Sequence, residues 1–315
     1  MTAPLVTGAA GFAGSHLIEH LLETEPSVAA WSNPEGRAPG QTDRRVLWRA
    51  VDLLDAGDVR DAIAELRPSA IYHCGGIANV GGSWSAPERA LRVNVLGTHH
   101  LLDGVKHAGL DCPILVTGSA LVYRPSAGPI SEDSPIGPTS PYGVSKLAQE
   151  MLAFQAAPAR TIVARPFNHA GPRQTTDYVT SAFARQIAEM EEGLAPPVLR
   201  VGNLESRRDI TDVRDVVRAY RLLLRSGQPQ RAYNVCSGTA YRVAELMEGL
   251  VGLSRLHIAM EVDAERLRPS DNPVVLGNRS RILEEVGWAP EIPIERTLAD
   301  LLDYWRQRVG SAPQS

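Results

Sequence analysis

The stretch TGAAGFAG at residues 7–14 decides the fold. Its three glycines are spaced three residues apart, between an apolar run typical of a strand and an amphipathic stretch of helix length. Glycines in that position allow a tight turn, a close approach of the backbone to a diphosphate, and close packing of the helix on the strand. The N-terminus of the helix then offers N–H groups to the anion. The residues expected to bind the diphosphate of a dinucleotide are Gly8, Gly11, Phe12, Ala13 and Gly14.

Strand-length apolar runs alternate with helix-length stretches through the first half of the chain. Repetition of strand, helix and strand predicts an α/β fold, a Rossmann-type doubly wound parallel sheet with ligands at the carboxyl ends of its strands. The strands are expected at residues 4–7, 27–31, 45–51, 70–74, 113–117 and 160–165. The helices are expected at residues 12–23, 58–67, 86–109 and 142–155.

The alternation weakens after residue 166, which suggests a smaller carboxyl-terminal substrate lobe. We expect a dinucleotide-binding Rossmann domain over residues 1–165 and a substrate lobe mainly over 166–315, with segments at about 205–240 returning to the first domain. The stretch at 165–177 is expected to be a loop, and the stretch at 257–273 to be rich in loops. Further elements are expected as helices near 178–192, from about 212 and at 296–308, and as strands near 199–202 and 233–238.

Composition excludes several classes of function. The chain has 32 Lys and Arg against 36 Asp and Glu, a net charge of −4, without a block of like charge, so we expect no nucleic-acid partner. No run reaches the roughly 18 apolar residues of a membrane span, and the N-terminus lacks the charged region of a signal peptide. Cys74, Cys112 and Cys236 are far apart and show no metal-ligand spacing, which predicts no metal site and a reducing compartment, the cytoplasm.

Residues that follow the second and third strands bear on the cofactor. An acid about 20 residues after the glycines would hold the ribose hydroxyl of NAD, but Ser32 and Asn33 stand there and Arg37 follows. The missing acid removes a charge that would repel a phosphate, and Arg37 could pair with one, so NADP is favoured, with NAD as the alternative. Asp52, next to Leu53, is expected either to accept from the adenine amino group or to cap a loop or helix.

The sequence SPYGVSK at residues 140–146 places Tyr142 and Lys146 on one face of a helix that begins at Pro141. A free phenol titrates at about pH 10. A nearby ammonium lowers that pKa, which would prepare Tyr142 for proton transfer. An exposed pair in which the tyrosine packs over the lysine stem is the alternative. Ser119 follows the fifth strand, at the sheet edge where Tyr142 could join it to complete a triad.

Together these motifs resemble the extended short-chain dehydrogenases/reductases, the NAD-dependent epimerase/dehydratase family. The resemblance rests on TGxxGxxG, the aspartate after the third strand, HCGG at 73–76, NVLGT at 94–98, Ser119 and YxxxK. It implies a Rossmann lobe and a carboxyl-terminal lobe that binds a nucleotide sugar. Later stretches resemble the branch that contains GDP-mannose 4,6-dehydratases and GDP-4-keto-6-deoxy-mannose reductases, and they lie at 165–172, 201–215, 233–238 and 267–278.

The resemblance also implies roles for single residues. Tyr142 would exchange a proton with a sugar hydroxyl or ketone, Lys146 would lower its pKa and hold the nicotinamide ribose, and Ser119 would bond the same sugar oxygen. Asn94 matches a cofactor-site position. The positions that match the substrate site are Asn168 for the sugar or its phosphate, Gly202 and Asn203 for the base, Arg208 and Arg268 for the diphosphate, and Asp271.

Four functions remain to be separated. A 4,6-dehydratase needs a further acid–base group, and in that branch a carboxylate stands two residues before Tyr123, where this chain has Leu121 after Ala120. Leu121, and Arg124 in place of the usual glycine, depart from the branch pattern. A 4-epimerase keeps NAD tightly, usually with the acid that is missing after the second strand. A cofactor-binding sensor or scaffold would not need the triad.

The expectation is therefore an NAD(P)H-dependent reductase of a nucleotide-activated 4-keto-6-deoxy sugar. The favoured substrate is GDP-4-keto-6-deoxy-D-mannose. Members of the family often form homodimers through helices that correspond to residues 85–108 and 142–157, and the resemblance implies the same assembly here.

Overall fold

A computed structural model describes residues 2–36, 43–156, 160–263 and 272–311. Its centre is a parallel sheet with the strand order β10-β6-β5-β4-β1-β2-β3. This is the predicted doubly wound Rossmann-type sheet, and the expected strands of the first half all belong to it. Its strands are β1 (Leu5–Thr7), β2 (Val28–Ser32), β3 (Val46–Ala50), β4 (Ile71–His73), β5 (Ile114–Thr117), β6 (Thr161–Pro166) and β10 (Arg231–Val235).

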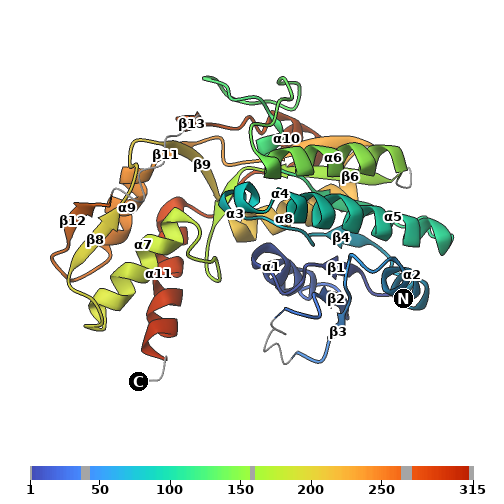
Figure 1. The fold of residues 1–315 in the computed structure, drawn as a ribbon, viewed down its shortest axis with the longest axis horizontal. Helices are drawn as coiled ribbons and strands as arrows, with labels where there is room; N and C mark the ends of the chain where they lie inside the picture. The colour runs from blue at the N-terminus through green and yellow to red at the C-terminus, as the bar shows by residue number, and fades with distance from the viewer. Residues whose placement is uncertain (1, 37–42, 157–159, 264–271, 312–315) are drawn as a thin grey trace.

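Helices cover both faces of this sheet (Figure 1). One apolar cluster joins the sheet to α1 (Phe12–Leu21), α8 (Val213–Ser226) and α10 (Ser280–Val286). A second cluster joins the opposite face to α2 (Ala56–Leu66), α5 (Gly97–His107) and α6 (Pro141–Ala156). Because successive side chains of a strand point to opposite faces, Leu5 and Val6 belong to different clusters. The strands are therefore buried on both sides, as their continuous apolar runs predict.

The helix expected at 86–109 is interrupted. The chain forms α3 (Val80–Ser85), α4 (Pro87–Leu91), a π-helical turn at Arg92–Leu96, and then α5. The wider turn carries Asn94, which is fully buried and bonded to the backbone of Ile77. Turns of this kind often mark functional sites, and helical periodicity alone does not reveal them.

The later segments form a third apolar cluster away from the main sheet, on the left of Figure 1. Its helices are α7 (Val179–Glu191), α9 (Val243–Gly252) and α11 (Ile294–Gly310). The strands outside the main sheet are β7 (Asn168–Ala170), β8 (Val198–Val201), β9 (Arg207–Asp212), β11 (Ala240–Arg242), β12 (Ala259–Val262) and β13 (Val274–Val275). β9 pairs with β7, β11 and β13, and β8 pairs with β12.

Two of these strands correct the expectations from sequence. β7 lies in the stretch expected to be a loop at 165–177, and β12 lies in the loop-rich stretch at 257–273. Both are short, and each pairs with a strand distant in sequence: β7 with β9, and β12 with β8. Their stability comes from this pairing rather than from local propensity.

The chain returns to the main sheet after its first excursion into the second lobe. α8 follows β9 and packs on α1, and β10 then pairs with β6 at the edge of the main sheet. A domain boundary at residue 165 stays a prediction. None of the described helices is both long enough and apolar enough to cross a membrane.

Candidate functional site

β1 and β4 are neighbours at the centre of the sheet, and the chain continues from them in opposite directions, to β2 and to β5. Ligands of such sheets bind outside the carboxyl ends of the strands at this reversal. The turn after β1 meets the segment after β4 there. Gly8 has φ of +63°, and a Cβ on it would lie 2.7 Å from the carbonyl carbon of Cys74 and from Cα of Gly75. Only glycine fits that position.

The same turn forms a cradle for an anion. The Gly11 N–H donates to the Gly8 carbonyl at 2.9 Å and closes the turn, while a Cβ on Gly14 would collide with that carbonyl. α1 begins at Phe12 without a side-chain cap, so N–H groups of its first turn are available to a ligand. The cradle fits a dinucleotide diphosphate, and we propose that Gly8, Gly11, Phe12, Ala13 and Gly14 bind it.

The residues expected at the adenosine end follow β2 and β3. Ser32 is the last residue of β2, and the side chain of Asn33 accepts from the Glu35 N–H at 3.0 Å. Asp52 accepts from the Leu54 N–H at 2.9 Å and closes its own turn, and its bond to adenine stays a prediction. Arg37 lies outside the described residues.

Leu53 and Asn94 shape the floor of the site. The Leu53 side chain lies against Gly75 and Gly97. Asn94 accepts from the Ile77 N–H at 2.8 Å and donates to the Ser145 hydroxyl at 2.9 Å, so it ties the segment after β4 to α6. These contacts make both residues supports of the cradle, where we propose that the cofactor lies.

The structure brings Ser119, Tyr142 and Lys146 together at the carboxyl edge of the sheet. Ser119 follows β5, and its hydroxyl shares a hydrogen bond with the phenol of Tyr142, near the start of α6. Lys146 lies one turn further on, with Nζ 6.0 Å from the centre of the Tyr142 ring. Tyr142 is 8% exposed and Lys146 5%, so the alternative of an exposed surface pair is wrong.

Electrostatics at the triad differ from the expectation. Burial raises the pKa of Tyr142 above its usual range, the bond from Ser119 opposes this, and nearby Tyr178 adds to it. Burial also lowers the pKa of Lys146 to about 8. The cost of removing a phenolate from water thus exceeds any help from the ammonium. Tyr142 is protonated at neutral pH, as a proton donor must be.

Two further residues reach this site without a signal in the sequence. The Ser83 hydroxyl, on α3, accepts from the Tyr142 N–H at 3.2 Å. Tyr178, beside the start of α7, donates from its hydroxyl to the Ala78 carbonyl at 3.2 Å. The Tyr178 bond therefore connects the start of α7, in the second lobe, to the segment after β4.

The expected substrate residues lie in the second lobe. Asn168 is exposed at the start of β7, which pairs with β9, the strand of Arg208. Arg208 donates to the carbonyls of Arg207 at 2.8 Å and Pro273 at 3.2 Å, and burial lowers its pKa. Gly202 and Asn203 follow β8, and Asn203 accepts from the Glu205 N–H at 3.0 Å. Arg268 and Asp271 lie outside the described residues.

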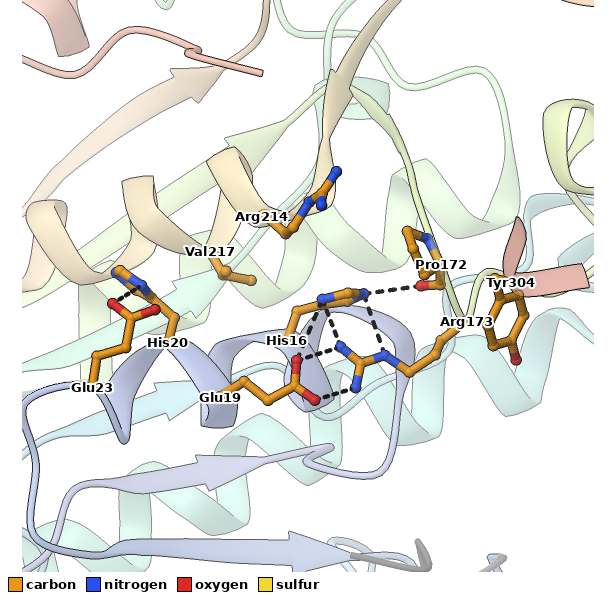
Figure 2. Close-up of a pocket in the computed structure, with 9 residues that line it drawn as sticks. All are labelled: His16, Glu19, His20, Glu23, Pro172, Arg173, Arg214, Val217 and Tyr304. Carbon is orange, nitrogen blue, oxygen red and sulfur yellow. Dashed lines mark hydrogen bonds and ion pairs between the residues drawn. The ribbon is translucent and has the colours of Figure 1, made fainter. Parts of the chain in front are cut away.

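A hollow of about 520 Å³ lies against α1, and none of the triad residues is among those that line it (Figure 2). There the Arg173 guanidinium lies between two residues of α1, with Nη2 2.6 Å from Nδ1 of His16 and 2.7 Å from a Glu19 oxygen. His16 Nε2 donates to the Pro172 carbonyl at 2.9 Å. These contacts fasten the loop after β7 to α1.

A family model described as GDP-mannose 4,6 dehydratase matches residues 5–301. The chain belongs to this family. The match spans the cradle, the triad and most of the second lobe, so it covers the whole site and not one motif.

Relatives within the GDP-mannose 4,6 dehydratase family include more than one activity. The chain is 37% identical to the GDP-6-deoxy-D-mannose reductase of Pseudomonas aeruginosa, over 96% of this chain and 97% of that protein. It is 25% identical to a GDP-mannose 4,6-dehydratase of Vibrio cholerae, over 95% and 92%. The structure of RMD from Pseudomonas aeruginosa complexed with NADPH is similar, with a TM-score of 0.86 and 34% identity over 98% of this chain and 100% of that one.

Proposed function

We propose that the protein reduces a nucleotide-activated 4-keto-6-deoxy sugar with NADPH, and that the sugar is GDP-4-keto-6-deoxy-D-mannose. The observation that carries the proposal is the buried, protonated phenol of Tyr142 beside Ser119 and Lys146. The name of the 37% identical relative and the NADPH in the similar solved structure support the substrate and the cofactor. So does the absence of an acid at Ser32 and Asn33.

The reaction adds a hydride to the C4 carbonyl carbon and a proton to its oxygen, which gives an alcohol. NADPH, bound in the cradle, would supply this hydride and become NADP⁺. Tyr142 donates the proton from its hydroxyl, and Ser119 hydrogen-bonds the same sugar oxygen. The Lys146 ammonium, 6.0 Å from the ring centre, stabilises the phenolate that Tyr142 becomes. Arg208 binds the diphosphate, and Asn168 orients the sugar.

Leu121 separates reduction from dehydration. It follows the serine of the triad by two residues, its N–H donates to the Ser119 hydroxyl at 3.1 Å, and its side chain is 36% exposed. Dehydration removes a proton from the sugar and expels its 6-hydroxyl, and a leucine can do neither. Reduction needs one proton, which Tyr142 provides.

Three assays distinguish the candidate reactions. With GDP-4-keto-6-deoxy-D-mannose we expect the purified protein to oxidise NADPH, measured by the absorbance of the reduced nicotinamide, with one reduced sugar formed per NADPH. With GDP-mannose alone we expect no keto sugar, measured by chromatography of the sugar nucleotides. Keto sugar formed from GDP-mannose without net change in cofactor would overturn the proposal in favour of a dehydratase. Interconversion of two epimers without added cofactor would select a 4-epimerase.

We also propose that the protein is a homodimer through α4, α5 and α6. α6 exposes Val144 at 46% and Met151 at 53%, seven residues apart and therefore on one side of the helix. Leu91 on α4 is 40% exposed and Leu96, just before α5, is 45% exposed. α4 and the π-helical turn both pack against α6, and exposed apolar side chains on neighbouring helices are typical of an interface between copies.

A substitution that introduces one charge tests the proposed dimer interface. Met151→Glu is expected to convert a dimer into a monomer in sedimentation equilibrium, because two carboxylates would be buried without partners. Met260→Glu, on β12 and 61% exposed, is the matched control and is expected to stay dimeric. A wild-type protein that sediments as a monomer at micromolar concentrations contradicts the proposal.

A further inference from the structure

A chain of buried polar side chains runs beneath the site, from α6 to β1. Lys146 Nζ donates to Gln149 Oε1 at 2.9 Å, and Gln149 Nε2 donates to Thr98 Oγ1 at 2.8 Å. Thr98 Oγ1 lies 2.8 Å from His73 Nε2, and His73 Nδ1 lies 2.8 Å from Thr7 Oγ1. None of the five side chains is more than 5% exposed. The chain thus connects the ammonium of the triad to the residue that precedes the glycine cradle.

The hydrogens at Thr98 have one consistent arrangement. The Thr98 hydroxyl donates its single hydrogen to the Asn94 carbonyl at 2.7 Å. Its oxygen therefore only accepts, both from Gln149 Nε2 and from Nε2–H of His73.

His73 is accordingly neutral, with its hydrogen on Nε2. Its Nδ1 accepts from the hydroxyl of Thr7, whose oxygen in turn accepts from the Gly75 N–H at 3.0 Å. Burial, and then the charge of Lys146, lowers the pKa of His73 to about 3. The ring keeps this tautomer across the working range of pH.

An amide is the one uncharged side chain that suits position 149. It must accept from an ammonium, which only donates, and at its other end donate to an oxygen that only accepts. A carboxylate would place two acceptors against each other at Thr98, and a methionine would make neither bond. Buried polar groups left without partners are costly. Gln149 avoids this cost because its oxygen faces a donor and its NH₂ group faces an acceptor.

The neighbours of Lys146 contribute little opposing charge. Nζ also donates to the Thr117 carbonyl at 2.9 Å. The titratable groups that face it are the Cys74 thiol after β4, neutral His73 on β4 and the Tyr142 phenol on α6, and burial raises the pKa of Cys74 to about 12. Within the described residues, the acceptors of Nζ are therefore a neutral carbonyl and a neutral amide. Two of the three ammonium hydrogens are donated to these acceptors, and the third can be donated to a ligand in the site.

We propose that Gln149 is a positioning residue for the reduction, which holds the Lys146 ammonium in place without neutralising it. Through Thr98 and His73, Gln149 also fixes the ammonium relative to Thr7, which precedes the cradle. The inference rests on the proposed function, because it assigns a role in that reaction to a residue that would touch neither sugar nor cofactor.

The test compares Gln149→Met, Gln149→Glu and the wild type over pH 6 to 10. Lys146 is a charged ammonium below its pKa and a neutral amine above it. Its pKa in the wild type is about 8, so NADPH affinity and kcat should fall as the pH rises through that value. In Gln149→Met the ammonium loses an acceptor, so the decrease in NADPH affinity and kcat should occur at a lower pH than in the wild type. At pH 7 we expect kcat to be lower than that of the wild type by at least about tenfold. In Gln149→Glu a carboxylate favours the ammonium, so the fall should move to higher pH.

Gln186→Met is the control for the substitution itself. Gln186 lies on α7 and accepts from the Arg200 N–H at 3.1 Å, far from the triad, and its variant should keep the wild-type pH profile. Thermal unfolding of each variant shows whether a change in activity comes from loss of the fold or from displacement of the Lys146 ammonium. Coincident pH profiles for all four proteins would overturn the inference.

NADPH affinity is measured by nicotinamide fluorescence without a sugar, so the two proposals can fail separately. A wild type that binds NADPH but does not reduce the keto sugar refutes the proposed substrate, while opposite shifts in the two Gln149 variants still support the positioning role.

Discussion

Tyr142→Phe is expected to lower kcat for reduction of the keto sugar by about 10²–10⁴-fold, the usual contribution of a positioned acid. The phenyl ring keeps the packing of a residue that is 8% exposed, but it has no proton to give and loses the bond with Ser119. NADPH affinity should stay within about twofold, because the phenol contributes to the chemical step rather than to the cradle. Stopped-flow absorbance of NADPH measures the rate, and fluorescence titration measures the affinity.

Tyr304→Phe is the matched control for this variant. Tyr304 lies on α11 and lines the hollow at α1, which none of the triad residues lines (Figure 2). The control should turn over at the wild-type rate. If Tyr142→Phe reduced the sugar as fast as Tyr304→Phe, the proton would have to come from another group, and Tyr142 would be removed from the mechanism.

The second large effect is expected at the cradle. Gly8→Ala should weaken NADPH binding by about a hundredfold or more and destabilise the fold. The left-handed backbone costs about 1–2 kcal/mol for an alanine. In addition the new methyl group would lie 2.7 Å from backbone atoms of Cys74 and Gly75, so the ends of β1 and β4 must separate.

Gly109→Ala is the control that separates the two effects of Gly8→Ala, the steric crowding and the backbone strain. Gly109 has φ of +61°, close to the +63° of Gly8, but a Cβ on it would have no atom within 4 Å. We expect this control to lose only the strain energy in chemical denaturation and to bind NADPH normally. Equal NADPH affinities for the two alanine variants would mean that the cradle does not hold the diphosphate.

The parts of this molecule that follow from the sequence are those specified by neighbouring residues. The three glycines before an amphipathic stretch predict the β1–α1 turn, and the four-residue spacing of Tyr142 and Lys146 predicts their shared helix face. Alternating runs predict the order of elements in the main sheet. Each of these signals is contained within a few residues, and tertiary contacts reinforce them.

Other features depend on contacts between distant segments. β7 and β12 are short, and each is held by a partner strand remote in sequence. The bond from Tyr178 to Ala78 spans 100 residues. The pKa of Tyr142 moves opposite to the expectation because burial, which a motif does not report, outweighs a neighbouring charge. Arg37, Arg268 and Asp271 remain predictions.

The return of β10 to the main sheet determines how the sheet is completed during synthesis. β6 ends at Pro166, and its outer neighbour begins only at Arg231, after β7, α7, β8, β9 and α8 have been made. Until then β6 is an open edge, whose unpaired N–H and C=O groups can pair with other chains. Pairing across so many residues also raises the contact order, which slows folding. The cofactor-binding sheet therefore cannot be obtained complete by ending the chain after β6, because its last strand is encoded beyond much of the substrate lobe.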